Sequence, residues 1–251
     1  MILHIVQKIT FNRAQGVIYL TEYGKKQIGH YLKKSPNSVV VAHGVNAQFQ
    51  LPAKTQFEIT HYTQENPFVI IYTSQIALYK HQVPVMQAVS LLKNKGYPLK
   101  LLIVGEPYTG TKIFNETRKR IDPQERFIGY LNHASQNQLV QLYQKADLFV
   151  FASSCESFGI TLLEAMSASL PITCSNRSVL PEILGDAGVY FDPENPSDIA
   201  TTIEKLINSP KLRTNLAKKA REKAMQYSWQ KCAYETFSFI SKVYNEWHKQ
   251  K

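Results

Sequence analysis

Short apolar runs alternate with helix-forming segments through most of the chain, and this alternation is the feature that most constrains the fold. The sequence predicts strands at 68–72, 99–104, 126–129, 147–151, 171–174 and 188–191, helices at 82–95, 110–121 and 135–145, and a largely helical stretch at 197–247. Parallel strands need a crossover connection, and helices of about ten residues supply one. The predicted fold class is therefore α/β, with a parallel sheet covered by helices on both faces.

A smaller unit of the same kind precedes this domain. Apolar residues at helical spacing predict a short amphipathic helix over residues 1–14, and predicted strands at 16–21 and 38–42 flank a helix at 22–32. This part of the chain holds one βαβ unit. Residues 47–66 are polar and irregular and have prolines at or near their ends, which is typical of a linker.

The stretch from 148 to 170 is where we expect a ligand to bind. A strand-like run at 148–152 is followed by a turn at Gly159 and then by a segment of good helix formers. In open α/β sheets, ligands bind where such turns leave the carboxyl ends of the strands. The first turn of the helix that follows offers unpaired N–H groups to an anion.

Two carboxylates bracket this turn. Glu156 lies in the loop, and Glu164 is the one charged residue between Gly159 and Leu170, so it lies on an otherwise apolar helix. A buried carboxylate needs partners, because its desolvation costs several kcal/mol. Spacing alone leaves two interpretations open. Either both side chains serve a ligand, or Glu164 pairs with a nearby Arg or Lys while Glu156 is a solvated loop acid.

The segment from Glu156 to Glu164 resembles the Glu-x7-Glu signature of retaining GT-B glycosyltransferases of family 4, also called glycosyl transferases group 1. The resemblance implies that Glu156 orients the donor sugar through its hydroxyls, as a catalytic residue, and that Glu164 contacts the ribose of the nucleotide. It also implies that the sugar and diphosphate are received by main-chain N–H groups, which fall on Phe158, Gly159, Thr161 and Leu162.

The same resemblance marks further positions of a donor site. Lys80 matches a catalytic lysine that neutralises the departing diphosphate, whereas Gln75 stands where the family commonly has an arginine. A glutamine donates a hydrogen bond but carries no charge, so stabilisation of the leaving group lacks one of its two cations. The remaining donor-binding candidates are Gly105, at the end of a buried strand, and Gly129, Tyr130 and Leu131, in the segment that resembles the reader of the nucleotide base.

The residues alone leave simpler interpretations open for several of these positions. Lys80 also fits a solvated loop lysine, Gly105 a tight turn, and Tyr130 an aromatic that packs at a strand end. Residues 180–188 resemble a turn of the family, in which Glu182 is expected to be a structural cap.

On this resemblance, the chain is the C-terminal half of a GT-B fold, with a Rossmann-like sheet. Residues 1–46 are expected to be the remnant of an acceptor-side domain, and 47–66 the linker. Residues 67–228 form the nucleotide-sugar donor-binding domain, and 229–251 a C-terminal crossover helix. The turn at 43–46 resembles the one that closes the N-terminal domain of such enzymes, which is much longer in the family.

The resemblance implies a hexosyltransferase that moves a sugar from a nucleoside-diphosphate donor to a glycan, lipid-linked or other acceptor with retained anomeric configuration. No cofactor is expected, and no metal, because the sequence contains no Asp-x-Asp motif. The alternative is a nucleotide-sugar-binding module that is inactive alone and pairs with a separate acceptor-domain chain. The shortened first domain and Gln75 favour the alternative, whereas the intact Glu-x7-Glu favours catalysis.

A formal net charge of +10 widens the choice of partners. Much of it lies in one predicted helix over 211–223, where a solvated face and attraction to an acidic membrane surface both fit the charge. Nucleic acid is not an expected partner, because no basic-aromatic module is recognisable. Three widely spaced cysteines form no metal motif, and no apolar run approaches the roughly 18 residues of a membrane span. We therefore expect a cytoplasmic protein, with peripheral contact to the inner face of the membrane as an option.

Overall fold

The computed structural model describes residues 2–32 and 37–249, and the chain divides into two compact units. The larger unit comprises residues 47–226, and the smaller unit comprises 1–46 together with 227–251. The larger unit includes residues 47–66, which form two short 3-10 turns, η1 (Ala47–Phe49) and η2 (Ile59–His61).

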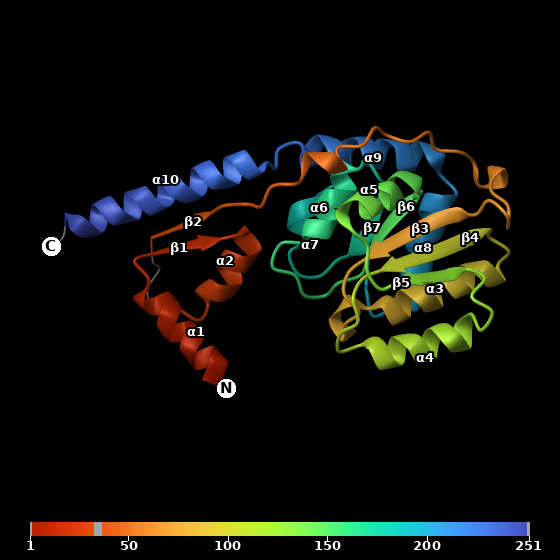
Figure 1. Cartoon of the computed structure of the whole chain (residues 1–251), viewed down its shortest axis with the longest axis horizontal. Coiled ribbons are helices and arrows are strands. Elements are labelled where there is room, and N and C mark those ends of the chain that lie inside the picture. The colour runs from red at the N-terminus through yellow and green to blue at the C-terminus, as the bar shows by residue number, and fades with distance from the viewer. Residues whose placement is uncertain (1, 33–36, 250–251) are drawn as a thin grey trace. The chain divides into compact units, whose positions relative to one another are not determined.

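A six-stranded parallel sheet, within the described residues, forms the centre of the larger unit (Figure 1). Its order is β5-β4-β3-β6-β7-β8. The strands are β3 (Phe68–Thr73), β4 (Leu99–Val104), β5 (Ile128–Leu131), β6 (Leu148–Phe151), β7 (Ile172–Ser175) and β8 (Val189–Phe191). The central strand β6 is buried on both sides, because helices cover both faces. The predicted α/β fold class is confirmed.

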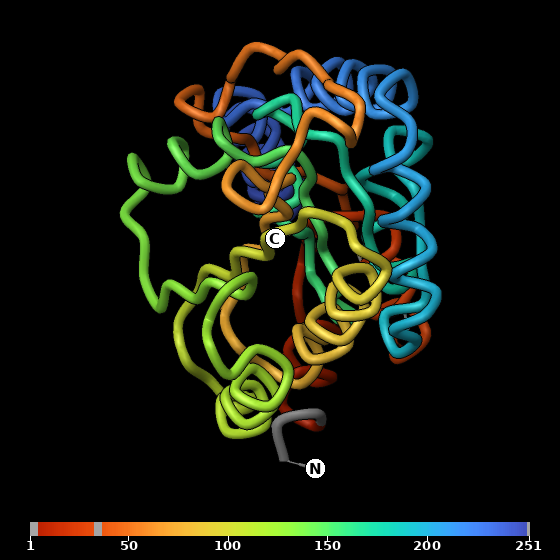
Figure 2. Tube along the Cα trace, turned by 90° about the vertical axis from the view of Figure 1, so that its right-hand side faces the viewer, coloured from red at the N-terminus to blue at the C-terminus, as the bar shows by residue number. Residues whose placement is uncertain are grey.

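Helices cover the two faces in two groups. The helices are α3 (Gln82–Asn94), α4 (Thr111–Ile121), α5 (Gln136–Lys145), α6 (Ile160–Ser167), α7 (Leu180–Leu184), α8 (Pro196–Ile207) and α9 (Pro210–Ala224). Figure 1 shows α3 and α4 on one face and α5 and α6 on the other. Along the chain after β8, α8 packs against α3 and α9 packs against α6, so each face gains one more helix (Figure 2).

Two of the differences from the sequence prediction have a clear structural reason. The strand expected at 126–129 begins instead at Ile128, because the Asp122 carboxylate accepts the backbone N–H groups of Arg126, Phe127 and Ile128 at 2.7–2.9 Å. The turn expected at 180–188 contains the short helix α7, which has a proline in its first turn, where a proline is well tolerated.

Buried charged side chains stabilise the amino ends of the strands. Asp147, directly before β6, accepts a hydrogen bond from the backbone N–H of Val69 at 2.8 Å. Its other oxygen accepts from the Lys54 ammonium at 2.7 Å and from the Tyr62 hydroxyl at 3.1 Å. This carboxylate therefore ties the segment before β3 to the start of two central strands.

Arg213 plays the same part from α9. Its guanidinium is fully buried and lies over the ring of Phe68, at the start of β3. It donates to the backbone carbonyls of Leu206, Ile207 and Phe57 and to the side chain of Gln56. One of the basic residues of the predicted helix at 211–223 is thus a structural group rather than part of a solvated face.

The smaller unit holds the predicted βαβ arrangement. It consists of α1 (Ile2–Arg13), β1 (Gly16–Tyr19), α2 (Glu22–Gly29), β2 (Asn37–Val40) and α10 (Trp229–His248). Strands β1 and β2 pair in parallel. Val17 and Tyr19 are buried on one face of β1, as a period of two along a strand requires.

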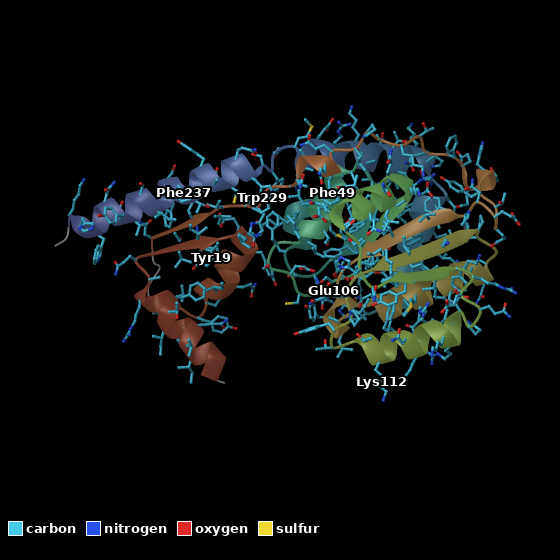
Figure 3. All side chains as sticks on the ribbon, viewed as in Figure 1. Tyr19, Phe49, Glu106, Lys112, Trp229 and Phe237 are labelled. Atoms are coloured by element: carbon cyan, nitrogen blue, oxygen red, sulfur yellow. The ribbon has the colours of Figure 1, made fainter. Side chains whose placement is uncertain are left out.

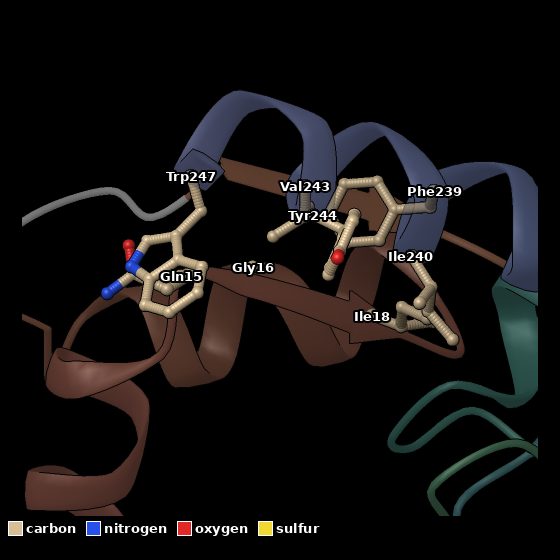
Figure 4. A pocket seen from close by; sticks show the side chains of 8 residues that line it. All are labelled: Gln15, Gly16, Ile18, Phe239, Ile240, Val243, Tyr244 and Trp247. Atoms are coloured by element: carbon tan, nitrogen blue, oxygen red, sulfur yellow. The ribbon is translucent and has the colours of Figure 1, made fainter. Parts of the chain in front are cut away.

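Helix α10 lies against the other face of β1 (Figure 4). A Cβ atom added to Gly16 would approach a methyl group of Val243 to 2.7 Å, so the glycine permits this close packing. A cavity of about 290 Å³ lies beside the contact and is lined by Gln15, Gly16, Ile18, Phe239, Ile240, Val243, Tyr244 and Trp247. Large apolar side chains of α10, including Trp229 and Phe237, stay exposed (Figure 3).

Among the described residues, no helix is both long and apolar enough to cross a membrane.

Candidate functional site

The order of the strands points to one place on the larger sheet. Strands β4 and β5 lie to one side of β3, whereas β6, β7 and β8 lie to the other, so the direction of winding reverses between β3 and β6. Open α/β sheets bind ligands at the carboxyl ends of the strands at such a reversal. The loops that leave these two ends are residues 74–81 and 152–159.

Lys80 ends a single 3-10 turn, η3 (Leu78–Lys80), in the first of these loops. Its ammonium donates a hydrogen bond to Oε1 of Glu156, in the second loop. The carbonyl of Lys80 accepts a hydrogen bond from the buried hydroxyl of Tyr72. Because Lys80 is 8% exposed, the interpretation as a solvated loop lysine is wrong.

Glu156 is held by its backbone as well as by its side chain. Its N–H donates to Oγ of Ser178 at 3.1 Å, and Ser178 returns a hydrogen bond to the carbonyl of Glu156, also at 3.1 Å. Ser178 has a left-handed backbone, with φ at 58°. The side chain of Glu156 is 14% exposed, so the interpretation as a solvated acid is wrong.

Helix α6 begins where the sequence predicts it. Gly159 precedes it with φ at 89°, a left-handed conformation that glycine adopts at little cost. Phe158, Gly159 and Leu162 are buried, and Thr161 is half-buried. The first N–H groups of a helix have no partner within it, so this turn presents donors beside the Lys80–Glu156 pair.

Glu164 lies in the second turn of α6, and its side chain is half-buried. Its Oε2 atom is buried and finds no hydrogen-bond partner within the described part of the chain. Burial raises the pKa of its carboxyl group from 4.5 to about 7. Among the described residues no positive charge offsets this burial, so the interpretation that Glu164 pairs with an Arg or Lys is wrong.

Tyr143 shares the surroundings of Glu164. Burial raises the pKa of the Tyr143 phenol, and the charge of Glu164 raises it further. The Tyr143 hydroxyl is 2.7 Å from Oγ1 of Thr73, the last residue of β3. The Tyr143 hydroxyl thus has a hydrogen-bond partner in Thr73, at the carboxyl end of β3.

Gln75 has a partner that the sequence did not indicate. Its amide donates to the hydroxyl of Tyr79 at 2.5 Å. Tyr79 lies next to Lys80, whose ammonium is 5.3 Å from the centroid of the Tyr79 ring. The uncharged Gln75 is therefore tied to the same turn that carries the cation.

The remaining candidates form a second group, at the ends of β4 and β5. A Cβ atom on Gly105, which has φ at 153°, would lie 1.8 Å from the carbonyl oxygen of Ser74, so only glycine fits there. The Tyr130 hydroxyl donates to the Gly105 carbonyl at 3.0 Å. Gly129 is paired with Leu102 inside the sheet, and Leu131 is partly exposed at the end of β5.

The structure therefore joins Lys80 to Glu156 at the reversal point, places Gly159 and Glu164 on the segment that follows Glu156, and sets Gly105 beside Ser74, one strand away. Sequence reasoning missed Tyr72, Tyr79 and Ser178, which hold the two loops. A local sequence signal is absent for Ser178, because it lies 22 positions from Glu156, whereas the contacts of Tyr72 and Tyr79 span only 8 and 4 positions. Within residues 2–32 and 37–249, no group of three or more His, Cys, Asp or Glu side chains is placed to hold a metal ion.

The sequence matches a number of curated glycosyltransferases, among them a mannosyltransferase and a capsular polysaccharide glycosyltransferase. The chain is 36% identical over 114 residues to O-antigen chain mannosyltransferase B of Escherichia coli, a match that covers 45% of this chain and 30% of that protein. It is 27% identical over 251 residues to the capsular polysaccharide biosynthesis glycosyltransferase CapM of Staphylococcus aureus, covering 94% of this chain and 65% of that protein. The chain thus spans less than two thirds of the length of each.

The fold has close counterparts among solved structures. One is Anabaena Alr3699/HepE in complex with UDP and glucose, with a TM-score of 0.81 and 19% sequence identity. The match covers 94% of this chain and 66% of that one. At this identity the likeness shows a shared fold.

A family model described as glycosyl transferases group 1 matches residues 54–223. The matched range includes both loops at the reversal point and all of α6. The chain belongs to the glycosyl transferases group 1 family.

Proposed function

We propose that the chain binds a nucleoside-diphosphate sugar at the reversal point and takes part in retaining, metal-independent transfer of a hexosyl group to a glycan or lipid-linked acceptor. The observation that carries the proposal is Oε2 of Glu164, a buried carboxylate oxygen without a partner among the described residues. A ribose has two vicinal hydroxyl groups, which are the kind of donor that an ionised carboxylate accepts. A nucleotide would thus remove the cost of burying Glu164.

The diphosphate would lie between Lys80 and the start of α6. Lys80 supplies a full positive charge, and the first N–H groups of α6 supply aligned donors. In a site that excludes water, these groups stabilise the negative charge that builds up as the sugar departs. We propose that they take the place of a metal ion.

Glu156 would orient the sugar. Its backbone is fixed by Ser178 and its carboxylate by Lys80, so its free lone pairs are preorganised to accept sugar hydroxyls. When the donor binds, the Lys80 ammonium would donate hydrogen bonds to the diphosphate as well as to Glu156. The ammonium has three donors, so it can serve both groups at once.

UDP-glucose is the first donor to test, since the similar Anabaena structure contains UDP and glucose. We would titrate the wild-type chain with UDP-, GDP- and ADP-glucose by calorimetry. Replacing Glu164 by alanine should weaken the one that binds by about tenfold or more. The control is Glu222→Ala, the same change on an exposed position of α9. If a folded wild-type chain binds none of the three, the donor site is refuted.

A binding module without catalysis is the second candidate function. It is favoured by Gln75, whose neutral amide donates to the Tyr79 hydroxyl. The proposed transfer chemistry could use a second cation at this position. Release of UDP from UDP-glucose, with and without lipid-linked or oligosaccharide acceptors, separates the two. Tight binding without any release would favour the module, which would then need a separate acceptor-domain chain.

We also propose that the chain acts at the cytoplasmic face of a membrane. The smaller unit has ten Lys and Arg residues against three Asp and Glu, and it exposes large apolar side chains. Anionic lipid attracts such a surface by about 1 kcal/mol for each nearby basic residue. Sedimentation with vesicles that contain phosphatidylserine, compared with neutral vesicles, would show binding that weakens as salt is added.

A further inference from the structure

His81 follows Lys80 directly and has an unusual backbone. Its φ of 52° and ψ of 35° lie in the left-handed region, which residues other than glycine seldom adopt. Such a conformation persists where the surroundings hold the residue in place. The side chain of His81 must therefore make contacts that offset the strain.

The ring of His81 contacts the opposite loop. Its Nε2 atom is 2.8 Å from Oγ of Ser154, two residues before Glu156. Ser154 itself bonds twice to the carbonyl of Tyr79, through its N–H at 2.9 Å and its hydroxyl at 3.2 Å. These contacts join the two residues that flank Lys80 to the loop that carries Glu156.

The direction of the hydrogen bonds follows from their partners. The Ser154 hydroxyl gives its hydrogen to the Tyr79 carbonyl, which can only accept. Its oxygen is then left to accept from the ring, so Nε2 of His81 carries a hydrogen. The hydrogen bonds thus run from the His81 ring to the Ser154 hydroxyl and from that hydroxyl to the Tyr79 carbonyl. A neutral ring suffices for this arrangement.

Acidic groups also surround the ring. Burial lowers the pKa of His81, and the nearby charges of Glu194 and Asp192 raise it in part. The neutral form, which suffices for this hydrogen-bond direction, is thus the one that burial favours.

We infer that His81 is a positioning residue, which locks the Lys80 turn to the Glu156 loop and so presets the spacing of the two charged groups. This inference rests on the proposed function, in which Lys80 receives a diphosphate and Glu156 a sugar. Preset spacing matters because a site whose groups are already placed loses less freedom when the ligand binds.

The test is His81→Gly. Glycine adopts the same backbone without strain, so the variant removes the ring and leaves the fold intact. The matched control is Glu125→Gly, because Glu125 has the same φ of 52° in the exposed turn before β5. In hydrogen exchange without ligand, we expect the amides of residues 79–82 and 153–156 to exchange about fivefold faster in His81→Gly and unchanged in Glu125→Gly.

Binding of UDP-glucose supplies the functional readout. We expect His81→Gly to weaken it by about five- to tenfold, with a melting temperature close to that of the wild type, and Glu125→Gly to leave it unchanged. His81→Gln, which can place an N–H near the same serine oxygen, should restore part of the affinity. A second variant, Ser154→Ala, should cost about as much as His81→Gly, and the double variant little more.

Each outcome is decisive. Unchanged exchange in both loops of His81→Gly, or an equal loss in Glu125→Gly, would overturn the role of His81. If the wild-type chain binds no nucleotide sugar, the proposed function fails by itself, whereas the exchange comparison needs no ligand and still decides whether His81 locks the two loops.

Discussion

One carboxylate at the carboxyl ends of the larger sheet lacks the hydrogen-bond partners that the buried charges at the amino ends have. At the amino ends of the strands, Asp122, Asp147 and Arg213 find several hydrogen-bond partners each. At the carboxyl ends, Glu164 is half-buried with a buried oxygen that has no partner in the described chain, and its pKa is raised to about 7. The first arrangement stabilises the fold, whereas the second costs stability and leaves a group ready for a ligand.

This comparison separates two kinds of variant. Changes at the amino ends should alter the free energy of unfolding and leave the ligand affinity of the folded chain unchanged. Changes at the carboxyl ends should alter the affinity, and removal of the strained or unpaired group should leave stability equal or higher. The residues that stabilise the fold and the residues that bind the ligand are therefore separate sets, although both lie on the same sheet.

The largest effect is expected at Arg213. In Arg213→Met, the carbonyls of Leu206, Ile207 and Phe57 lose their shared donor and stay buried, so we expect a loss of about 3–5 kcal/mol in the free energy of unfolding. Urea denaturation measures it. Lys211→Met, an exposed position of the same helix, is the control. A loss below about 1 kcal/mol would show that the amino end does not depend on this residue.

Glu164 should make stability depend on pH, in the opposite sense to a paired carboxylate. Its pKa is about 7 in the folded chain and near 4.5 when unfolded. Below pH 4.5 both states are protonated, so the group has no effect. As pH rises to 7 only the unfolded state ionises freely, and the wild type loses about 3 kcal/mol through this group.

The variant Glu164→Gln lacks this loss, because its amide does not titrate. Urea midpoints at pH 5 and pH 8 should therefore fall with pH in the wild type and change much less in the variant. At pH 8 the variant should be the more stable of the two. An equal pH dependence in both proteins would mean that Glu164 ionises in the folded chain as an ordinary surface acid does.

Asp147→Asn should cost about 2 kcal/mol of stability. The NH2 group of the asparagine would face either the N–H of Val69 or the ammonium of Lys54, both of which are donors. At least one of the hydrogen bonds that Asp147 accepts is therefore lost. Asp186→Asn changes an exposed side chain in the same way and serves as the control. Affinity for UDP-glucose should be the same in all three proteins. A weaker affinity in Asp147→Asn would break the separation between the two ends.

The smallest effect in free energy is expected at Lys80. Lys80→Met keeps the length of the side chain but removes its charge, and we expect the dissociation constant for UDP-glucose to rise about tenfold, or ~1.4 kcal/mol. Calorimetry checks it. Lys112→Met is the control, on an exposed part of α4 (Figure 3). Equal affinities in the two variants would show that Lys80 does not face the diphosphate.

Much of the fold followed from the sequence because its signals are local. Apolar runs and helical spacing predicted the strands and helices, and β4 has the bounds expected for it. The start of β5 could not be predicted, since it depends on Asp122 accepting three N–H groups from the residues before and at the strand. Helix α7 has five residues, which is too short for a periodic signal.

The sequence predicted that Lys80 and Glu156 lie in loops at the sheet, but not that they pair with each other. The topology placed Lys80 and Glu156 at the carboxyl ends of strands, yet their ion pair joins residues that are 76 positions apart. Spacing alone could not decide whether Glu164 has a cation for a partner, because that depends on which side chains of other elements reach α6. The left-handed backbone of His81 also depends on a distant partner, Ser154.

The most direct test of the account is the pH dependence of UDP-glucose binding, measured by calorimetry at pH 6 and pH 8 in the wild type and in Glu164→Gln. Both phosphates of this donor are esterified, so the ligand itself does not titrate in this range. If the ribose binds the ionised form of a group with a pKa of about 7, wild-type affinity should be about tenfold weaker at pH 6, with release of a proton on binding. The variant should show neither effect. Wild-type binding that is independent of pH and equal to that of Glu164→Gln, or no binding by a folded chain, would contradict the account.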